Sequence, residues 1–97
     1  MGRGRAKREE LRRELVELIE ESRDSWIKAA FFSDPTVANL LEELHERWAG
    51  SGGVGAPLDY AEQNELEELV TRARRYSSMS SSEAARLVIE RMTGSPR

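Results

Sequence analysis

Residues 34–48 read Asp34-Pro35-Thr36-Val37-Ala38-Asn39-Leu40-Leu41-Glu42-Glu43-Leu44-His45-Glu46-Arg47-Trp48. The apolar side chains of this stretch recur at the three- and four-residue spacing of one helical face: Val37, Leu40, Leu41, Leu44 and Trp48. Asp34 can accept hydrogen bonds from the first free amides of a helix, and Pro35 has the φ angle that a helix start needs. The stretch therefore predicts a helix over 35–48, whose Leu44 and Trp48 must be covered by the rest of the chain or by a partner.

A second amphipathic stretch precedes this helix. Its stripe residues keep helical spacing: Leu11, Leu15, Leu18, Ile19, Ser22 and Trp26. Because Pro35 restricts the residue before it, we expect a helix over 9–32 that ends at Ser33. Residues 9–49 then form a helical hairpin. Residues 1–8 contain two glycines and no apolar anchor beyond Met1 and Ala6, so they are expected to be a flexible basic tail.

The second half of the chain follows a glycine-rich loop at 50–57. Asp59 and Glu62 have the spacing of a capping box, which predicts a helix over 59–76. Ser80 and Glu83 repeat that spacing and predict a helix over 81–92, with a flexible C-terminus at 93–97. The predicted fold is all-α, without a sheet. It has four short helices in two hairpins, 9–49 and 58–92, within a single helical domain at 9–92.

Composition indicates a thin core. The chain has 97 residues, of which 38% are hydrophobic and 34% charged, and typical domains are only about 25% charged. We therefore expect a homo-oligomer that completes burial between chains. The residues expected at that oligomer or partner interface are Leu11, Leu15, Leu18, Ile19, Trp26, Leu44 and Trp48. Packing of the first helix against the third and fourth helices of the same chain is the alternative.

The net charge of −3 hides a segregation of charge along the chain. Residues 1–13 carry six positive and two negative side chains, residues 14–71 carry three and fourteen, and residues 72–97 carry six and two. An acidic middle with two basic ends can steer polyanions to those ends or pair with itself, and an ordinary solvated helical surface is the alternative. There is no cysteine and no long apolar run. We expect no signal peptide and no membrane partner, and a cytoplasmic location.

One constellation suits a phosphate group. Guanidinium groups near the end of the third helix are followed by hydroxyls and free amides at the start of the fourth, and a basic N-terminus adds further charge. The residues expected to contact nucleic acid or phosphate are Arg72, Arg74, Arg75, Ser80, Ser81, Ser82, Arg3, Arg5, Lys7 and Arg8. A charged helix end followed by ordinary caps is the competing interpretation, since no feature here reads base edges.

Two resemblances to known families follow from short segments. Residues 66–70 and 76–91 resemble the two helices of ribbon-helix-helix DNA-binding proteins, with Ser80, Ser82 and Glu83 at the positions of that family's helix cap. The resemblance implies a DNA-binding regulator, but residues 52–57 make a poor version of the family's DNA-reading strand. The turn Trp48-Ala49-Gly50 is similar to that of the small WXG secretion family, whose members are dimeric helical hairpins. The Asp34-Pro35 break departs from that pattern.

A possible metal site depends on Glu42 and His45, which form Glu-x-x-His on a helix. In ferritin-like carboxylate proteins this spacing directs both side chains toward a metal, and dimerisation can complete the ligand set. Here Glu17, Glu20 or Glu21 would have to supply the missing ligands, because His45 is the only histidine. A surface histidine at the edge of the apolar stripe is the alternative.

No sequence feature favours an enzyme, a cofactor or a small-molecule substrate. The chain has no cysteine, no phosphate-binding loop after a strand and no serine nucleophile elbow. We therefore predict a small non-enzymatic helical binding or regulatory protein that self-associates and uses its basic ends to contact nucleic acid or an acidic partner. A protein-only adaptor or inhibitor is the principal alternative.

Overall fold

The computed structural model describes residues 3–94 of the chain. In chain order, its elements are α1 (Arg3–Leu15), the π-helical turn η1 (Val16–Glu20), α2 (Ser25–Phe32), α3 (Pro35–Gly50), the 3-10 turn η2 (Pro57–Tyr60), α4 (Gln63–Ser77) and α5 (Ser81–Met92). Within this described range every regular element is helical and there is no strand. The prediction of an all-α fold is confirmed. The flexible C-terminus predicted at 93–97 lies mostly outside the described residues.

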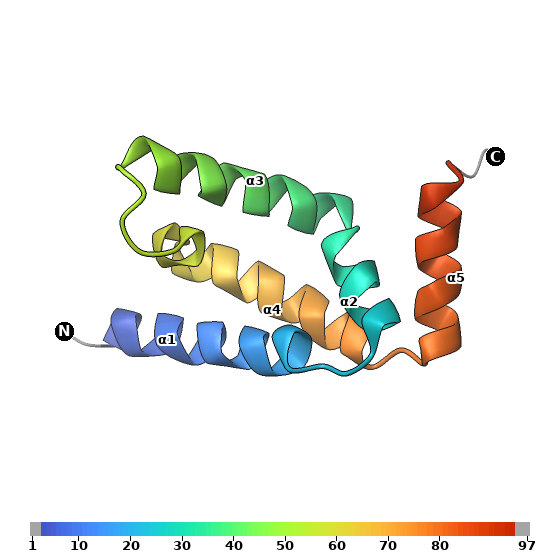
Figure 1. Ribbon diagram of the computed structural model, residues 1–97. Helices are drawn as coiled ribbons and strands as arrows, with labels where there is room; N and C mark the ends of the chain where they lie inside the picture. Colours follow the sequence, from blue (N-terminus) through green and yellow to red (C-terminus); the bar gives the residue numbers. More distant parts are fainter. Residues whose placement is uncertain (1–2, 95–97) are drawn as a thin grey trace.

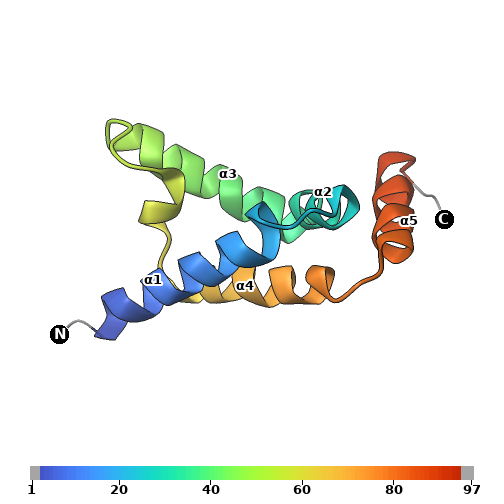
Figure 2. The ribbon, with the colours of Figure 1, turned by 60° about the horizontal axis from the view of Figure 1, so that its bottom comes forward.

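The three long helices lie roughly lengthwise beside one another (Figure 1). α1 and α4 pack together and run in the same direction, with Glu14 paired to Arg74 near their C-terminal ends. α3 runs the opposite way, so Arg47 near its end reaches Glu65 near the start of α4. α5 stands across one end of this group and packs on α2 (Figure 2). The molecule measures 46 × 26 × 21 Å.

The arrangement of four helices in two hairpins is not confirmed. α1 pairs with α4 instead of folding back on α3, and α5 packs on α2 instead of returning along α4. The physical reason is the placement of the apolar faces. The buried face of α1 finds its complement on α4, where Leu66, Leu69 and Val70 are all buried. Hairpin formation between neighbours in the chain would have left that α4 face with less cover.

The predicted helix over 9–32 is wrong in its interior. α1 passes into η1, and the chain then leaves the helix before α2 begins at Ser25. Two side chains compete with the helical hydrogen bonds at this break. Ser22 Oγ accepts from the Asp24 N–H at 3.1 Å, and Asp24 accepts from the amides of Trp26 and Ile27, at 2.9 and 3.2 Å. Asp24 is therefore the N-cap of a new helix.

The helix start predicted at Glu9 is also wrong, because α1 begins at Arg3, inside the segment expected to be a tail. Contacts that are distant in sequence support its early turns. Arg8 donates to the carbonyl of Asp59 at 3.1 Å, and Arg12 forms an ion pair with the Asp59 carboxylate. These contacts come from η2, about fifty residues away, so they could not be predicted from the local sequence.

The helices opened by Asp34 and Ser80 begin where the sequence predicts. Asp34 accepts from the amides of Thr36 and Val37, at 2.8 and 3.1 Å. Ser80 and Glu83 form the predicted capping box, with N–H to oxygen distances of 3.1 and 3.0 Å. Both caps act within three residues, which is why the sequence alone is sufficient to find them.

The start of α4 differs from the predicted Asp59. Asp59 instead accepts from the Ala56 N–H at 2.9 Å and stabilises η2. The chain then extends through Ala61, and α4 begins at Gln63. Glu62 is the N-cap residue, and its N–H donates to the Glu65 carboxylate at 2.9 Å. Two pairs of acidic residues are therefore present at cap spacing, Asp59 with Glu62 and Glu62 with Glu65, and the helix uses the second pair.

A single apolar core joins the helices and takes up most of the side chains expected at an interface. Leu11, Leu15, Ile19 and Leu44 are buried within the chain, and Leu18 packs partly buried against them. Trp48 is half-buried, and its indole N–H donates to the carbonyl of Gly55 at 3.0 Å. Of the expected interface residues, Trp26 alone is strongly exposed. Packing within the chain therefore covers the stripe of α1 without a partner.

Candidate functional site

Most of the exposed large hydrophobic side chains of the described residues belong to α2 and α5. Among the described residues, the large hydrophobic side chains that stay exposed are Trp26 (41%), Phe32 (48%), Val54 (71%), Ile89 (50%) and Met92 (77%). Four of these five belong to α2 or α5, two helices that pack on one another. We call Trp26, Phe32, Ile89 and Met92 together the α2–α5 set. Exposed aromatic and long aliphatic side chains gathered on neighbouring elements are typical of protein interaction sites.

α5 is held to the rest of the molecule by polar contacts at both ends. Near its C-terminus, Arg91 donates to the carbonyl of Ala30 and to Ser33 Oγ, each at 2.7 Å. Near its N-terminus, the Ser81 hydroxyl donates to the Asp24 carboxylate. Ala84 and Val88 are buried between these anchors. The fixed orientation leaves Ile89 and Met92 on the exposed side of the helix.

A buried polar cluster links α3, α4 and α5. Asp34 is only 3% exposed. Besides capping α3, its carboxylate accepts from the Tyr76 hydroxyl and from Arg72 Nη1, the latter at 3.0 Å. Arg91 donates to the same Tyr76 oxygen at 2.8 Å, and its guanidinium lies 5.6 Å from the centre of the tyrosine ring. The Asp34 carboxylate therefore links α3 to α4, and the Tyr76 hydroxyl links α4 to α5.

The cluster changes the ionisation of its members. Burial raises the pKa of Asp34, but hydrogen bonds from Tyr76 and the Val37 amide, with the charge of Arg72, outweigh it and leave the pKa below the usual 3.8. Burial raises the pKa of the Tyr76 hydroxyl, and its hydrogen bond to Asp34 raises it further. Asp34 is therefore an anion at neutral pH, and Tyr76 is a neutral donor. An anionic acceptor paired with a neutral donor is suited to a stable structural hydrogen bond between helices.

The arginines expected to contact phosphate are largely paired inside the protein. Arg72 donates to Glu68 at 2.6 Å as well as to Asp34. Arg74 makes a bidentate pair with Glu14, at 2.6 and 2.7 Å. Arg75 is exposed and forms no ion pair with any side chain in residues 7–94. Of these three cations, only Arg75 keeps its charge available to a phosphate.

The other predicted phosphate ligands are dispersed. Ser80 caps α5, Ser81 contacts Asp24, and Ser82 is exposed. Lys7 is exposed, whereas Arg8 contacts Asp59. Arg3 and Arg5 lie in α1, but their side chains are outside the part of the chain whose side chains are described. The structure therefore does not gather the predicted residues around one anion.

The Glu42 and His45 pair has no further ligand nearby in the described chain. No group of three or more metal-binding side chains occurs within the described residues. His45 instead lies beside Trp48, with ring centres 5.2 Å apart. A metal site shared between two copies stays a prediction.

The structure lacks the local feature expected for one of the two resembling families and contains the local feature expected for the other. Residues 52–57 form no strand, so the DNA-reading element of the ribbon-helix-helix family is missing from this segment. The Trp48-Ala49-Gly50 turn does end a helix. The following loop folds over Trp48, so closely that the Cβ of any side chain at position 53 would lie 3.6 Å from the indole ring. Gly53 also has a φ of +74°, which a side chain would strain. This turn therefore has a structural explanation in the covering of Trp48.

Comparison of the chain with protein-family models, curated proteins and solved structures found no match. None of the helices in the described residues is long and apolar enough to cross a membrane. Function must therefore be inferred from the side chains that the chain itself presents.

Part of the α2–α5 set could have been found in the sequence from runs of consecutive apolar residues, which the search for helical periodicity did not consider. Leu87, Val88 and Ile89 are consecutive, and successive residues on a helix point about 100° apart. Three large apolar side chains in a row therefore cannot all face one neighbour. The same reasoning applies to Phe31 and Phe32, of which the first is buried and the second exposed. This signal accounts for Phe32 and Ile89, but not for Trp26, which is exposed although it belongs to the predicted stripe.

Acid should destabilise the protein through its paired carboxylates. Hydrogen bonds from Arg74 and Arg47 lower the pKa of Glu14 and Glu65 respectively, in addition to the lowered pKa of Asp34. A lowered folded-state pKa contributes stability above the unfolded-state pKa, and this contribution is lost as pH falls through the folded value. We expect the free energy of unfolding, measured by urea denaturation, to fall from pH 5 to below pH 4.

Asp34→Asn is the informative variant in this titration. It removes one titrating group, so its free energy of unfolding should depend less steeply on pH over the same interval. An equally steep dependence in the variant and the parent protein would show that Asp34 makes no such contribution.

Proposed function

We propose that this protein is a non-enzymatic interaction module that self-associates through the exposed apolar side chains of α2 and α5. The observation that carries the proposal is the concentration of exposed large hydrophobic side chains on these two packed helices. Burying such side chains between copies contributes the main favourable free energy of association. A cytoplasmic location is part of the same proposal.

The extent of the molecule supports an assembly. Its accessible surface is 6440 Å² for a mass of 11.0 kDa, whereas the scaling for compact monomers gives about 5600 Å². The excess is similar to the roughly 800 Å² that each partner buries in a standard interface. The radius of gyration of 14.6 Å likewise exceeds the roughly 12.5 Å expected for a compact domain of this length. A second copy docked on α2 and α5 would cover part of the excess accessible surface.

The basic-end alternative, in which the two basic ends of the chain contact nucleic acid, has weaker support from the folded structure than from the sequence. Two of the three arginines near the end of α4 that were predicted to contact phosphate, Arg72 and Arg74, form ion pairs within the protein. Their partners are Asp34, Glu68 and Glu14. Exposed ion pairs of this kind compete with any external phosphate for the same guanidinium donors. Among the predicted contact residues whose side chains are described, the cations that stay exposed outside these ion pairs are Lys7 and Arg75.

The test is the mass of the protein in solution as a function of concentration. We expect sedimentation equilibrium to show the parent protein shifting from monomer to dimer across the micromolar range. The double substitution Ile89→Glu with Met92→Glu should weaken association by more than about a hundredfold, because burying each carboxylate costs at least about 1–3 kcal/mol. Both positions are exposed, so the helical circular dichroism should be preserved.

Val54→Glu is the matched control, since Val54 is equally apolar and exposed but lies in the loop after α3. It should associate like the parent protein. A parent protein that stays monomeric at all concentrations contradicts self-association. Equal weakening by Val54→Glu would show that the effect is one of net charge and not of the α2–α5 set. Binding to duplex or single-stranded nucleic acid at low salt, with no self-association, would favour the basic-end alternative.

A further inference from the structure

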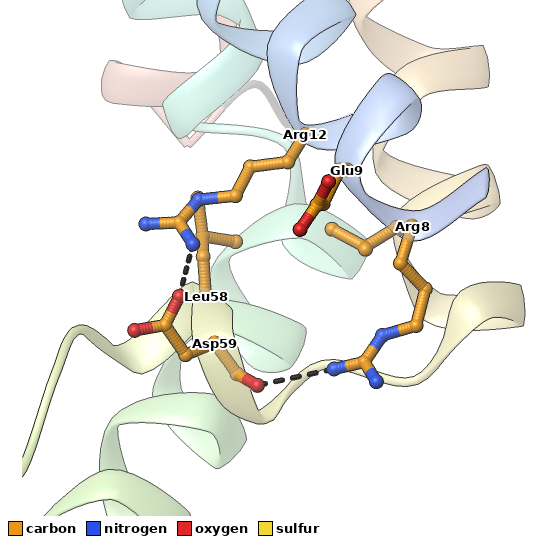
Figure 3. A pocket seen from close by; sticks show the side chains of 6 residues that line it. Arg8, Glu9, Arg12, Leu58 and Asp59 are labelled. Atoms are coloured by element: carbon orange, nitrogen blue, oxygen red, sulfur yellow. Dashed lines mark hydrogen bonds and ion pairs between the residues drawn. The ribbon is translucent and has the colours of Figure 1, made fainter. Parts of the chain in front are cut away.

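A separate pocket lies between the early turns of α1, η2 and the start of α4 (Figure 3). The start of α1 and α5 lie at opposite ends of the molecule (Figure 1). Its volume is about 330 Å³, at the lower end of the range for small-molecule sites. It is lined by Arg8, Glu9, Arg12, Leu58, Asp59 and Leu66. Figure 3 shows Arg8 and Arg12 reaching from the same helix to either side of Asp59.

The two arginines of the pocket differ in how their charge is neutralised. Arg12 is paired with the Asp59 carboxylate. Arg8 donates only to the main-chain carbonyl of Asp59, at 3.1 Å, and forms no ion pair with any side chain in residues 7–94. Its Nε is buried and has no hydrogen-bond acceptor. Arg91 is also partly buried without an ion pair in residues 7–94, but it donates to Ala30, Ser33 and Tyr76. Arg8 has a single main-chain acceptor, so part of its hydrogen-bonding capacity is unused.

The anionic side chains of the pocket compete only weakly for Arg8. The Asp59 carboxylate is already engaged by Arg12 and by the Ala56 amide, and these contacts hold its pKa below the ordinary value, the amide contributing most. Glu9 is exposed, so water screens its charge. The charge of Arg8 also contributes to the lowered pKa of Asp59, as the smallest of the causes, but the ion pair of Asp59 is with Arg12. Arg8 is therefore the partly buried charged side chain of the pocket that forms no ion pair in residues 7–94.

We propose that this pocket binds a small oxyanion, a carboxylate or phosphate group, against the guanidinium of Arg8. A guanidinium presents several N–H donors in a plane that matches the oxygens of either group, so one anion can accept from more than one of them. Arg12 adds positive charge on the facing side, and Leu58 and Leu66 offer contact to an apolar portion of the ligand. The proposal is independent of self-association through the α2–α5 set.

The test is an NMR titration of the full chain with sodium phosphate and, separately, sodium acetate. Sodium chloride keeps the ionic strength constant and supplies the baseline. We expect saturable shifts of the Arg8 Nε–H and Leu66 methyl signals with at least one of the two anions, and the stronger of the two identifies the class of ligand. Arg8→Gln should weaken binding by about tenfold or more, as expected for loss of a charge-assisted hydrogen bond.

Arg13→Gln is the matched control, because it removes the same charge from an exposed site on the same helix outside the pocket. It should leave binding within about twofold of the parent protein, since exposed charges at such a distance are largely screened. Glu9→Gln should tighten binding about twofold to fivefold by removing a neighbouring negative charge.

Three results would overturn the proposal. The first is the absence of saturable shifts with both phosphate and acetate. The second is equal weakening by Arg8→Gln and Arg13→Gln, which would indicate a diffuse charge effect. The third is weaker binding of phosphate or acetate in Glu9→Gln, because removal of a neighbouring negative charge should strengthen the binding of an anion at Arg8. Preserved helical circular dichroism in each variant ensures that a loss of binding is not a loss of fold.

Discussion

Phe31→Ala should lower the free energy of unfolding by about 3–5 kcal/mol, the usual cost of deleting a buried aromatic side chain. Phe31 is 2% exposed and lies where α2 meets the rest of the core. Its ring packs edge-on against Tyr76, with centres 6.5 Å apart, and against Phe32, with centres 5.1 Å apart. Removing it leaves a cavity beside the buried polar cluster and loses both aromatic contacts. Urea denaturation followed by circular dichroism measures the effect.

The adjacent residue provides the control. Phe32 is half exposed, so Phe32→Ala should cost about 1 kcal/mol, chiefly the loss of the aromatic contact. The two variants have the same composition and differ only in which phenylalanine is lost. Similar losses of stability in both variants would mean that α2 does not present one face to the core and the other to solvent.

Asp34→Ala should lower the free energy of unfolding by about 2–4 kcal/mol. The cap of α3 contributes about 1 kcal/mol of this, and the buried Tyr76 hydroxyl that loses its acceptor contributes about 1–3 kcal/mol. Arg72 keeps Glu68 as a partner, so its charge is not left unpaired. The corresponding fall in Tm is about 8 °C or more for a domain of this size, and thermal melting by circular dichroism would measure it.

Asp24→Ala separates the cap from the buried cluster. Asp24 caps α2 through two amides and contacts Ser81, but these contacts lie near the surface. Its replacement should cost about 1 kcal/mol, the usual value for an N-cap. If Asp34→Ala costs no more than Asp24→Ala, the link from Asp34 to Tyr76 adds nothing to stability.

The parts of the fold that could be predicted from the sequence are those governed by neighbours in the chain. The Asp34 and Ser80 caps use donors two or three residues away, and the starts of α3 and α5 follow from them. The break before α2 was also encoded locally. Ser22 and Asp24 have the short polar side chains that compete for backbone groups, and the strong apolar period around them obscured this signal. A second pair of acidic residues at cap spacing similarly obscured the start of α4.

The candidate sites could be predicted less well. The sequence identified the arginines at the end of α4 as phosphate ligands because they cluster along the chain. It could not show that Arg74 meets Glu14, sixty positions away, or that Arg72 meets Asp34. Arg91 was absent from every predicted site, yet it fastens α5 to α2 and to Tyr76. Such pairings depend on which helices become neighbours in space.

The helical class of the protein, the starts of α3 and α5 and the positions of the apolar stripes can be predicted from short stretches of the chain. Capping and helical periodicity act over three to seven residues, so a local pattern contains them. The pairing of α1 with α4, the link from Asp34 through Tyr76 to Arg91, and the exposure of Ile89 and Met92 arise only in the folded molecule. Those outcomes depend on the competition among several apolar faces for the same cover. That competition is resolved by contacts between segments up to about sixty residues apart, such as that of Arg91 with Ala30.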